Sequence, residues 1–393
     1  MTNETDAMGN IREYLVGNGL KTSRVFNPKT LMLESIVTSK DKRIYQDLGY
    51  EYDDFGNLLS RSKKTGTYKK ETFEYDDFDR VVKISLDDVV MCEMLYDDLG
   101  NVLEKKINDT RVIYNATYDN NKPYHLIEAK TDAENLFGGA DQKVVYSIFD
   151  NIVELSDDEK ILSIEYGCDY KRKKMHYDNE SGYVSKVYVG DCEFVDNNGV
   201  MSRLTYIKGP LGVFAVSVID DEGNSSINYI HKDNLDSWNL ITDEYGDVLQ
   251  ETSFDAWGNM RDPDTWMIEP DNKILMYDRG FTGHEHLLDF GLINMNGRVY
   301  DPLLSMMLSP DNNIQVPQMS QNFNRYSYCL NNPLKYNDPT GEWVESLIFG
   351  VVGGASNVLF NASDIDNFAE GALLFGAGFA KGFLTEITMG QSW

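Results

Sequence analysis

The chain has 393 residues, and 36 Lys and Arg against 64 Asp and Glu give it a formal net charge of −28. A chain this acidic lacks the positive potential that attracts DNA or RNA, so we expect no nucleic-acid partner. The 41% of apolar residues suffice for a large core, and 24 Tyr against only 10 Pro favour β structure.

The first third of the chain repeats itself at a fixed period, which is typical of a repeat architecture. Copies of a Tyr-Asp segment begin at Tyr52, Tyr75, Tyr96 and Tyr118, so the spacing between them is nearly constant. Turn-forming residues such as Asp-x-Gly-Asn follow the Tyr, and a short run of alternating apolar and polar residues follows the turn. Each copy therefore predicts one β-hairpin, and successive hairpins bury a shared face by stacking into a coiled sheet.

Turn signals continue beyond residue 120 with looser spacing, and apolar alternation persists between them. The segment 1–330 contains neither a long amphipathic helix pattern nor a Pro-rich linker. We therefore predict a mainly β fold, in which repeated antiparallel β-hairpins over 1–228 form a coiled, shell-like sheet. Four regular repeats are too few to close such a shell, so we expect further repeats in the full-length protein.

The Tyr-Asp repeats and a series of motifs from residue 229 on resemble the Rhs/YD-repeat family, bacterial polymorphic toxins and their relatives. These motifs include Phe-Asp-Ala-Trp-Gly-Asn, Phe-Thr-Gly-His-Glu and Asn-Asp-Pro-Thr-Gly, and they follow the family's order over more than 100 positions. The matching segments are 229–237, 254–261, 281–285, 296–302, 308–311, 324–328 and 331–341. The resemblance covers roughly 6–342 and assigns 229–342 to the family's core domain.

This resemblance implies a hollow β-shell that encloses a C-terminal effector, with the core domain as a plug at one end. The expected function is a non-catalytic shell and scaffold that encapsulates and delivers the effector. Expected partners are the effector itself, an immunity protein and a secretion machinery. The full-length protein would be secreted or exposed at the cell surface, and cytoplasmic before export. The polar N-terminus of this chain shows no secretory signal peptide.

In some members of the family the core is an aspartyl autoprotease that releases the effector after an Asp-Pro-x-Gly-Leu motif. By motif, the two carboxylates and the arginine implicated there correspond to Asp311, Asp338 and Arg298. Two carboxylates that share a site have pKa values pushed apart, so one acts as base and the other as acid. The sequence departs from the cleaving members at Asn312, where they have Pro, and at Glu342, where they have Leu. The alternative is a structural plug in which the arginine is a buried ion-pair partner.

Three further patterns favour structural roles over functional ones. His284 and His286 would share one face of a strand, but no third ligand with zinc-like spacing accompanies them. Trp238, Trp257 and Trp266 are typical core residues, with a carbohydrate-binding adhesin as the alternative. The four cysteines show neither metal nor disulfide spacing. The sequence therefore predicts no metal and no cofactor.

The composition changes at Trp343, where an apolar tail rich in small residues begins. Its apolar runs span 347–360 and 369–383, and each is shorter than the ~20 residues of a bilayer-spanning helix. We expect 343–393 to form a helical remnant of the effector region inside the shell, with membrane contact through 346–383 as the alternative. Only ten residues follow the second run, so we expect the effector domain itself to be missing.

Overall fold

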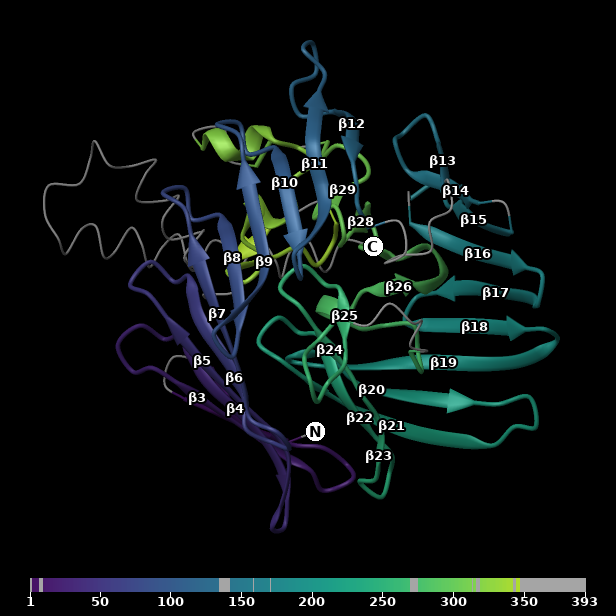
Figure 1. Ribbon diagram of the computed structural model, residues 1–393. Helices are drawn as coiled ribbons and strands as arrows, with labels where there is room; N and C mark the ends of the chain where they lie inside the picture. Colours follow the sequence, from purple (N-terminus) through teal and green to yellow (C-terminus); the bar gives the residue numbers. More distant parts are fainter. Residues whose placement is uncertain are drawn as a thin grey trace, which may run out of the picture.

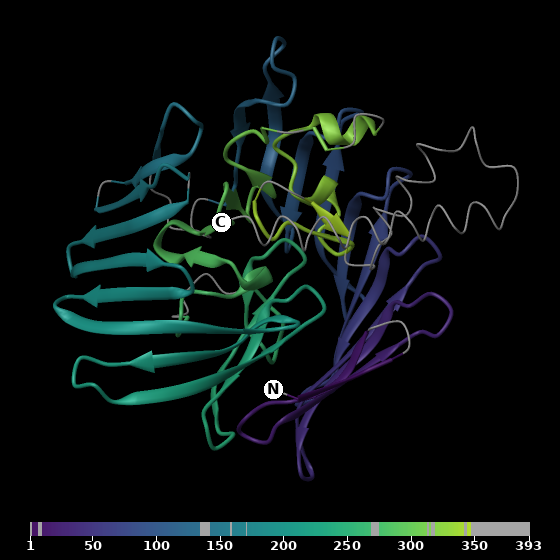
Figure 2. The ribbon, with the colours of Figure 1, turned by 180° about the vertical axis from the view of Figure 1, so that it is seen from behind.

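The computed structural model describes residues 2–6, 10–133, 142–157, 159–169, 171–268, 275–312, 314–315, 319–341 and 344–346. This described part is built almost entirely of antiparallel strands, which confirms the predicted mainly β fold. Figure 1 shows a first large sheet in purple and blue and a second in teal and green, with the later part of the chain between them. The view from behind shows the same two walls and the same insert (Figure 2).

The first sheet is a 12-stranded meander in which every strand pairs with its neighbours in sequence. Its strands are β1 (Thr2–Thr5), β2 (Ile11–Leu15), β3 (Lys21–Phe26), β4 (Leu33–Lys40), β5 (Arg43–Tyr52), β6 (Leu58–Lys63), β7 (Lys69–Tyr75), β8 (Val81–Leu86), β9 (Val89–Tyr96), β10 (Val102–Ile107), β11 (Thr110–Tyr118) and β12 (Leu126–Lys130). Pairing between consecutive strands is the arrangement that a row of hairpins produces.

The second sheet is an 11-stranded meander, and its described strands do not pair with those of the first sheet. Its strands are β13 (Lys143–Tyr146), β14 (Ile152–Ser156), β15 (Lys160–Tyr166), β16 (Arg172–Asn179), β17 (Gly182–Val189), β18 (Cys192–Asn197), β19 (Val200–Gly209), β20 (Gly212–Ile219), β21 (Ser225–Lys232), β22 (Trp238–Thr242) and β23 (Val248–Glu251). The sheet thus runs past residue 228, and the domain boundary at that position stays a prediction.

The described residues between 253 and 341, here called the core segment, form short strands and 3-10 turns. These are β24 (Ser253–Phe254), β25 (Met260–Arg261), η1 (Phe281–Gly283), β26 (Glu285–Leu287), η2 (Leu288–Phe290), β27 (Leu292–Asn294), β28 (Val299–Asp301), β29 (Met306–Met307), η3 (Ser320–Phe323), η4 (Cys329–Asn331) and β30 (Tyr336–Asn337), which pairs with β31 (Glu345–Ser346) just beyond the segment. Strands β26 to β29 make a separate four-stranded sheet.

The acidic turns of the repeats close as the sequence predicts. Asp53 Oδ1 accepts hydrogen bonds from the backbone N–H groups of Phe55 and Asn57, at 2.9 and 2.8 Å. Gly56 has a φ of +84°, a left-handed conformation that Gly adopts with the least strain. The turn after β9 has the same geometry around Asp97. The repeated Asp therefore caps the turn that joins one strand to the next.

The repeated tyrosines link each hairpin to the one before it. Tyr75 donates its hydroxyl hydrogen to the carbonyl oxygen of Leu58, the first residue of β6, at 2.7 Å. Tyr96 contacts Val81, the first residue of β8, in the same way at 2.9 Å. Tyr118 reaches the first residue of β10, also at 2.9 Å. The regular spacing of the repeat is thus the spacing that brings each hydroxyl to the previous return strand.

The core segment packs against both sheets and so joins them. Trp257 and Tyr300 are fully buried in the largest apolar cluster, which includes Ile84 of the first sheet. A second cluster places Leu292 of the core segment against Ile164 of the second sheet. Because apolar burial is the main favourable term in folding, these two clusters hold the core segment between the sheets as a wedge.

Asparagine side chains of the core segment also fasten it to the turns of the first sheet. Asn332 Nδ2 donates to Asn57 Oδ1 at 3.0 Å and to the carbonyl oxygen of Asp79 at 2.7 Å. Its neighbour Asn331 donates from Nδ2 to the carbonyl oxygen of Gly100 at 2.9 Å. Of the two adjacent asparagines, Asn332 therefore contacts the turns at Asn57 and Asp79, and Asn331 contacts the turn at Gly100.

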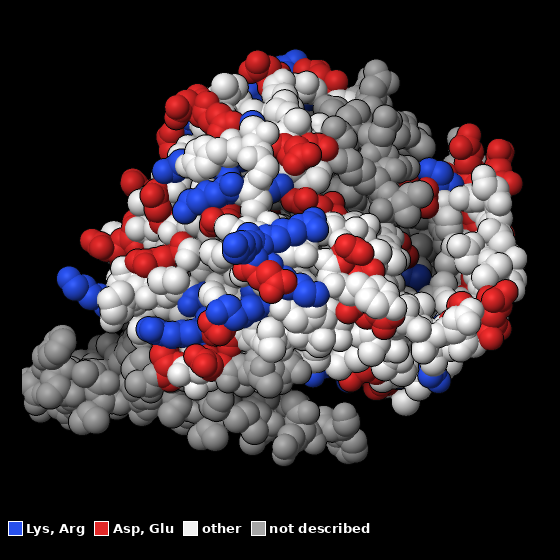
Figure 3. Space-filling model, turned by 90° about the horizontal axis from the view of Figure 1, so that it is seen from below, with Lys and Arg blue, Asp and Glu red and all other residues white. Residues whose placement is uncertain are grey.

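Acidic and basic side chains alternate on the lower face of the molecule despite its net charge, and this face is hollowed beside an outer wall (Figure 3). Among the described residues, no helix combines the length and the apolar character needed to cross a bilayer. The tail at 343–393 lies outside the described residues except for 344–346. Its predicted helices and its membrane contact through 346–383 therefore stay predictions.

Candidate carboxylate–arginine site

Arg298 lies in the tight turn between β27 and β28. The backbone N–H of Met295 donates to the carbonyl oxygen of Arg298 at 2.9 Å and closes this turn. Asn296 adopts a left-handed φ of +71°, which Asn tolerates better than most residue types. The side chain of Arg298 is buried, with 6% of the residue exposed, so its guanidinium must find its partners inside the protein.

The guanidinium of Arg298 contacts both predicted carboxylates. Its Nη2 lies 3.0 Å from Asp338 Oδ2 and 3.3 Å from Asp311 Oδ2. Its Nη1 donates to the carbonyl oxygen of Arg325 at 3.1 Å, and its Nε donates to the carbonyl oxygen of Gly341. Asp338 is 0% exposed and Asp311 is 7% exposed. The structure thus brings together the three side chains that the motif indicates, and their chemical role stays a prediction.

Backbone contacts fix the two carboxylates in place. The N–H of Asp311 donates to the carbonyl oxygen of Arg325 at 2.8 Å, and Arg325 Nη1 donates to the carbonyl oxygen of Asp311 at 3.0 Å. Asp338 follows β30, and its N–H donates to Asn337 Oδ1 at 2.8 Å. Three other parts of the core segment, at Asp311, Arg325 and 338–341, therefore supply the partners of one buried guanidinium. A guanidinium is the group suited to several planar hydrogen bonds at once.

The Asp-Pro-Thr-Gly motif is held by the same turn and by His284. The carbonyl oxygen of Pro339 accepts hydrogen bonds from Asn296 Nδ2 and from His284 Nε2, both at 3.2 Å. The carbonyl oxygen of Thr340 accepts one from the backbone N–H of Gly297 at 2.9 Å. Sequence reasoning missed the first two donors. Both donors lie in segments that match the family motifs, so the sequence did offer a reason to consider them as site residues.

The two histidines of the core segment are buried and engaged by protein groups. His284 Nδ1 lies 2.7 Å from Thr282 Oγ1, and His286 Nε2 accepts a hydrogen bond from the N–H of Phe281 at 3.0 Å. Burial lowers the pKa of His284 to about 4 and that of His286 to about 3, so both rings are neutral at pH 7. No group of three metal-ligating side chains occurs in the part of the chain that the structure describes.

Between these histidines, Glu285 forms the centre of a buried ion cluster. Its carboxylate lies 2.6 Å from Lys186 Nζ and 2.5 Å from Arg172 Nη1, and it accepts a hydrogen bond from Tyr188 at 3.0 Å. Burial alone would raise the pKa of Glu285, but these two cations and Arg279 hold it well below its usual range. The cluster joins the core segment to the second sheet, because both close cations come from that sheet.

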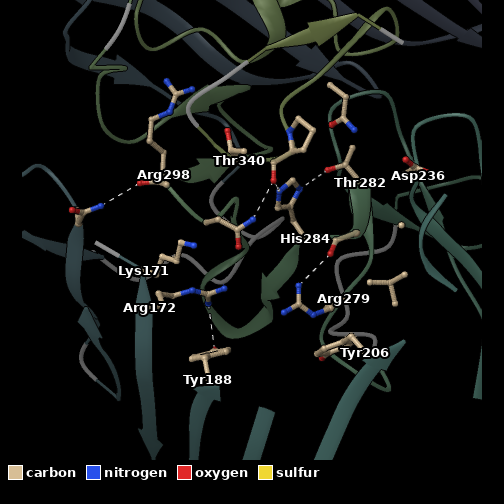
Figure 4. A pocket seen from close by; sticks show the side chains of 18 of the residues that line it. Lys171, Arg172, Tyr188, Tyr206, Asp236, Arg279, Thr282, His284, Arg298 and Thr340 are labelled. Atoms are coloured by element: carbon tan, nitrogen blue, oxygen red, sulfur yellow. Dashed lines mark hydrogen bonds between the residues drawn. The ribbon is translucent and has the colours of Figure 1, made fainter. Parts of the chain in front are cut away.

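A cavity of about 1400 Å³ lies between the second sheet and the core segment. Tyr188 and Tyr206 of the second sheet line it, as do His284, Arg298 and Thr340 of the core segment (Figure 4). The guanidinium that contacts both carboxylates therefore borders the cavity, and so does the Asp-Pro-Thr-Gly motif.

The three tryptophans considered for sugar binding lie inside the protein. Trp257 is 0% exposed and Trp238 is 2% exposed. Trp266 is 6% exposed and packs against the guanidinium of Arg261, which lies 4.1 Å from the ring centre. A sugar platform needs aromatic faces at the surface, and these rings do not present one.

No family model matches the chain. Among curated proteins, the chain is similar to the tRNA3(Ser)-specific nuclease WapA of Bacillus spizizenii, with 24% identity over 354 residues. It is also similar to the tRNA nuclease WapA of Bacillus subtilis strain 168, with 25% identity over 358 residues. Each alignment covers 86% of this chain and 14% of the relative, so the chain spans about a seventh of the length of these proteins.

Among solved structures, the chain resembles the TcdB2-TccC3-Cdc42 structure with a TM-score of 0.71 at 18% identity. It is equally similar to the structure of a Photorhabdus luminescens Tc holotoxin pore with a mutation in TccC3, with a TM-score of 0.71 at 18% identity. These matches cover 86% and 87% of this chain and 19% of each neighbouring chain. At this level of identity, the likeness shows a shared β-shell fold.

The shell fold, the sequence similarity and the order of the motifs together fit the Rhs-type family. The chain aligns with a part of the WapA tRNA nucleases of Bacillus, and its fold is similar to that of a part of the TccC3-containing structures.

Proposed function

We propose that this chain is a closing segment of an Rhs-type toxin shell, which encloses a polypeptide cargo that follows Gly341. The observation that carries this proposal is the wedge between the two sheets. On one side, Lys105 of the first sheet is fully buried and donates from Nζ to Ser305 Oγ at 2.7 Å. On the other side, the Glu285 cluster ties the core segment to the second sheet. A segment fixed on both sides in this way keeps the walls in one relative position.

The course of the chain supports an enclosed cargo. Pro339 and Thr340 line the cavity, so the chain passes its wall just before residue 342. The names of similar proteins are consistent with a downstream effector. The Bacillus relatives are tRNA nucleases, and one structural neighbour is described as TccC3 without its hypervariable C-terminal region. By analogy, the cargo is an effector polypeptide, and an immunity protein and an export machinery act on the full-length protein.

Limited proteolysis tests this enclosure on the chain itself. Trypsin cleaves after Lys381 in the tail, and we expect this cleavage to be at least tenfold slower than in a synthetic peptide of residues 343–393. The control site is Lys42, which is exposed in the turn between β4 and β5. Mass spectrometry identifies both cuts. Equal rates at the tail site in chain and peptide would contradict the enclosure.

The shared guanidinium favours a second function, and we propose that Asp311 and Asp338 cleave the chain near residue 342. Two buried carboxylates on one Arg form the acid–base pair that peptide hydrolysis needs. The cavity beside Arg298 supplies the water. The purified 44.8 kDa chain should shorten on incubation, and Asp338→Asn should prevent this. Persistence of the intact mass after days at 37 °C would refute self-cleavage and leave the shell function untouched.

A further inference from the structure

We propose that one end of the first sheet is a docking surface for a basic amphipathic helix of a protein partner. The surface consists of three apolar residues, Phe55, Phe78 and Leu99, each of which follows an acidic residue in the sequence. These three residues are here called the turn row. The inference does not rest on the enclosed cargo or on self-cleavage, because it concerns a different part of the molecule.

The meander brings the turn row to one end of the first sheet. Phe55 lies in the turn between β5 and β6, Phe78 in that between β7 and β8, and Leu99 in that between β9 and β10. Because consecutive strands pair antiparallel, every second turn lies at the same end of the sheet. Each of the three backbone N–H groups donates to the Asp two residues earlier, at 2.9, 3.0 and 2.8 Å. The three residues therefore occupy the same position in successive turns.

The turn row is more apolar than the turn geometry requires. Phe55 is 78% exposed, Phe78 is 52% exposed and Leu99 is 45% exposed. At the same position of two other turns, the chain has the polar residues Asn121 and Glu222, which are also exposed. Single exposed apolar residues are common on protein surfaces, but three in a regular row indicate a contact with a partner.

Two equivalent residues show what this turn position does when it has a partner. Leu235 and Trp257 each donate a backbone N–H to the Asp two residues earlier, at 2.9 and 2.8 Å. Both side chains are buried in the largest apolar cluster, where they pack against other segments. An apolar residue at this position thus fills a contact elsewhere in this fold. In the turn row, the described residues leave much of each side chain uncovered.

A negative charge lies beside each apolar side chain of the turn row. Asp54, Asp77 and Asp98 are exposed, and none of the three has an ion-pair partner within the part of the chain that the structure describes. The Asp that precedes each of them is different, because it accepts hydrogen bonds from the backbone of its own turn. The surface therefore fits a partner whose apolar and positive residues recur at the same spacing.

The spacing of the turn row favours a helix over an extended chain. Two strand spacings of about 4.8 Å place successive turns about 10 Å apart. Every seventh residue of an α-helix returns to the same face after a rise of about 10.5 Å. Residues that share a face of an extended strand lie about 7 or 14 Å apart, so an extended chain does not match the row. The partner helix should have an apolar residue at every seventh position with Lys or Arg beside it, over about 15 residues or more.

The core segment holds the turns of the row in fixed positions. Gln321 Nε2 donates to the carbonyl oxygen of Phe78 at 2.6 Å. The neighbouring turns are held by Asn331, which contacts Gly100, and by Asn332, which contacts Asn57. A surface that is already ordered loses little conformational freedom when a partner binds. The turn row is thus prepared for docking in the free protein.

A synthetic helical peptide tests the surface on the full chain. It has about three heptads, each with one Leu and a neighbouring Lys on the same face, and Ala and Gln elsewhere. Fluorescence anisotropy should show saturable binding, with a dissociation constant on the order of 10–100 µM for so small a contact. A scrambled peptide of the same composition should bind about tenfold more weakly or not at all.

Variants of the chain assign the binding to the turn row. Phe78→Ser should weaken binding about tenfold or more, because it removes the middle apolar contact. Phe149→Ser is the matched control, because Phe149 is also 52% exposed and occupies the equivalent position of a turn in the second sheet. This control should bind the peptide as the wild type does. Circular dichroism should show the same fold for each variant, since the replaced side chains are exposed.

A charge swap tests the acidic residues. The triple variant Asp54→Lys, Asp77→Lys and Asp98→Lys should lose the Lys peptide and bind a peptide in which Glu replaces Lys. The inference would be overturned by an absence of saturable binding, by equal binding of the scrambled peptide, or by an equal loss in Phe149→Ser. Self-association of the chain that Phe78→Ser abolishes would also overturn it, because a second copy would then cover the row.

Discussion

The burial of His286 predicts a specific loss of stability in acid. The ring packs against Phe254, with 5.2 Å between the ring centres, and its Nε2 accepts a hydrogen bond from the N–H of Phe281. Burial, helped by the neighbouring His284, lowers the pKa of His286 from 6.5 to about 3. Near pH 4.5 the folded protein therefore keeps this ring neutral, while the unfolded chain binds a proton there.

The sign and the size of the effect follow from linkage. Because the folded-state pKa lies below the unfolded value, the unfolded chain binds more protons and stability falls as the pH drops from 6.5 toward 3. Each pH unit within that window costs about 1.4 kcal/mol. Between pH 7.5 and pH 4.5, His286 alone should lower the free energy of unfolding by about 2.7 kcal/mol.

The variant His286→Gln isolates this contribution, because Gln keeps an acceptor for the N–H of Phe281 and does not titrate. Urea unfolding of wild type and variant at pH 7.5 and 4.5 gives four free energies. On going from pH 7.5 to pH 4.5, the wild type should lose about 2.7 kcal/mol more unfolding free energy than the variant. His125→Gln, in an exposed segment, is the matched control. A difference that is the same at both pH values would refute the reasoning.

Three further changes test the wedge and the repeats. Glu285→Gln should cost about 3–5 kcal/mol in urea unfolding, because it leaves buried cations without their partner, and a loss under about 1 kcal/mol would contradict the cluster. Tyr96→Phe should lower the free energy of unfolding by about 1 kcal/mol, because it leaves the Val81 carbonyl without its hydroxyl donor. Tyr245 is 73% exposed, and Tyr245→Phe should leave the free energy of unfolding unchanged. Gly100→Ala, at a φ of +83°, should lower the melting temperature through about 1–2 kcal/mol of backbone strain, and an unchanged melting temperature would count against that conformation.

The repeat hairpins could be predicted because their signal is local. The Asp of each turn bonds the backbone two and four positions later, and Gly supplies the left-handed turn, so a single repeat unit contains all that one hairpin needs. The three side chains of the candidate site were also predicted. In that case the information came from the resemblance of whole motifs to a family, and the residues alone do not indicate that Asp311 and Asp338 share one arginine.

The parts that sequence reasoning missed depend on partners far apart in the chain. Glu285 pairs with Arg172 and Lys186, which are 113 and 99 residues earlier. The sequence between them gives no sign that these charges meet, because nothing fixes the curvature of the second sheet locally. The break between the two sheets has the same origin. Strand β12 ends the first sheet and β13 begins the second, and no local pattern in the sequence marks that point.

The tyrosine contacts have a consequence for how such shells change in length. Each repeat donates a hydrogen bond to the previous one and offers a carbonyl group to the next, as Tyr75, Tyr96 and Tyr118 show. Gain or loss of a complete repeat leaves every tyrosine hydroxyl with a carbonyl acceptor. An insertion or deletion of a few residues would instead leave one hydroxyl and one carbonyl group in the interior without a partner. Duplication of whole repeats is therefore the low-cost route by which the wall grows longer. The wedge, which contacts particular turns, sets the point from which that growth must start.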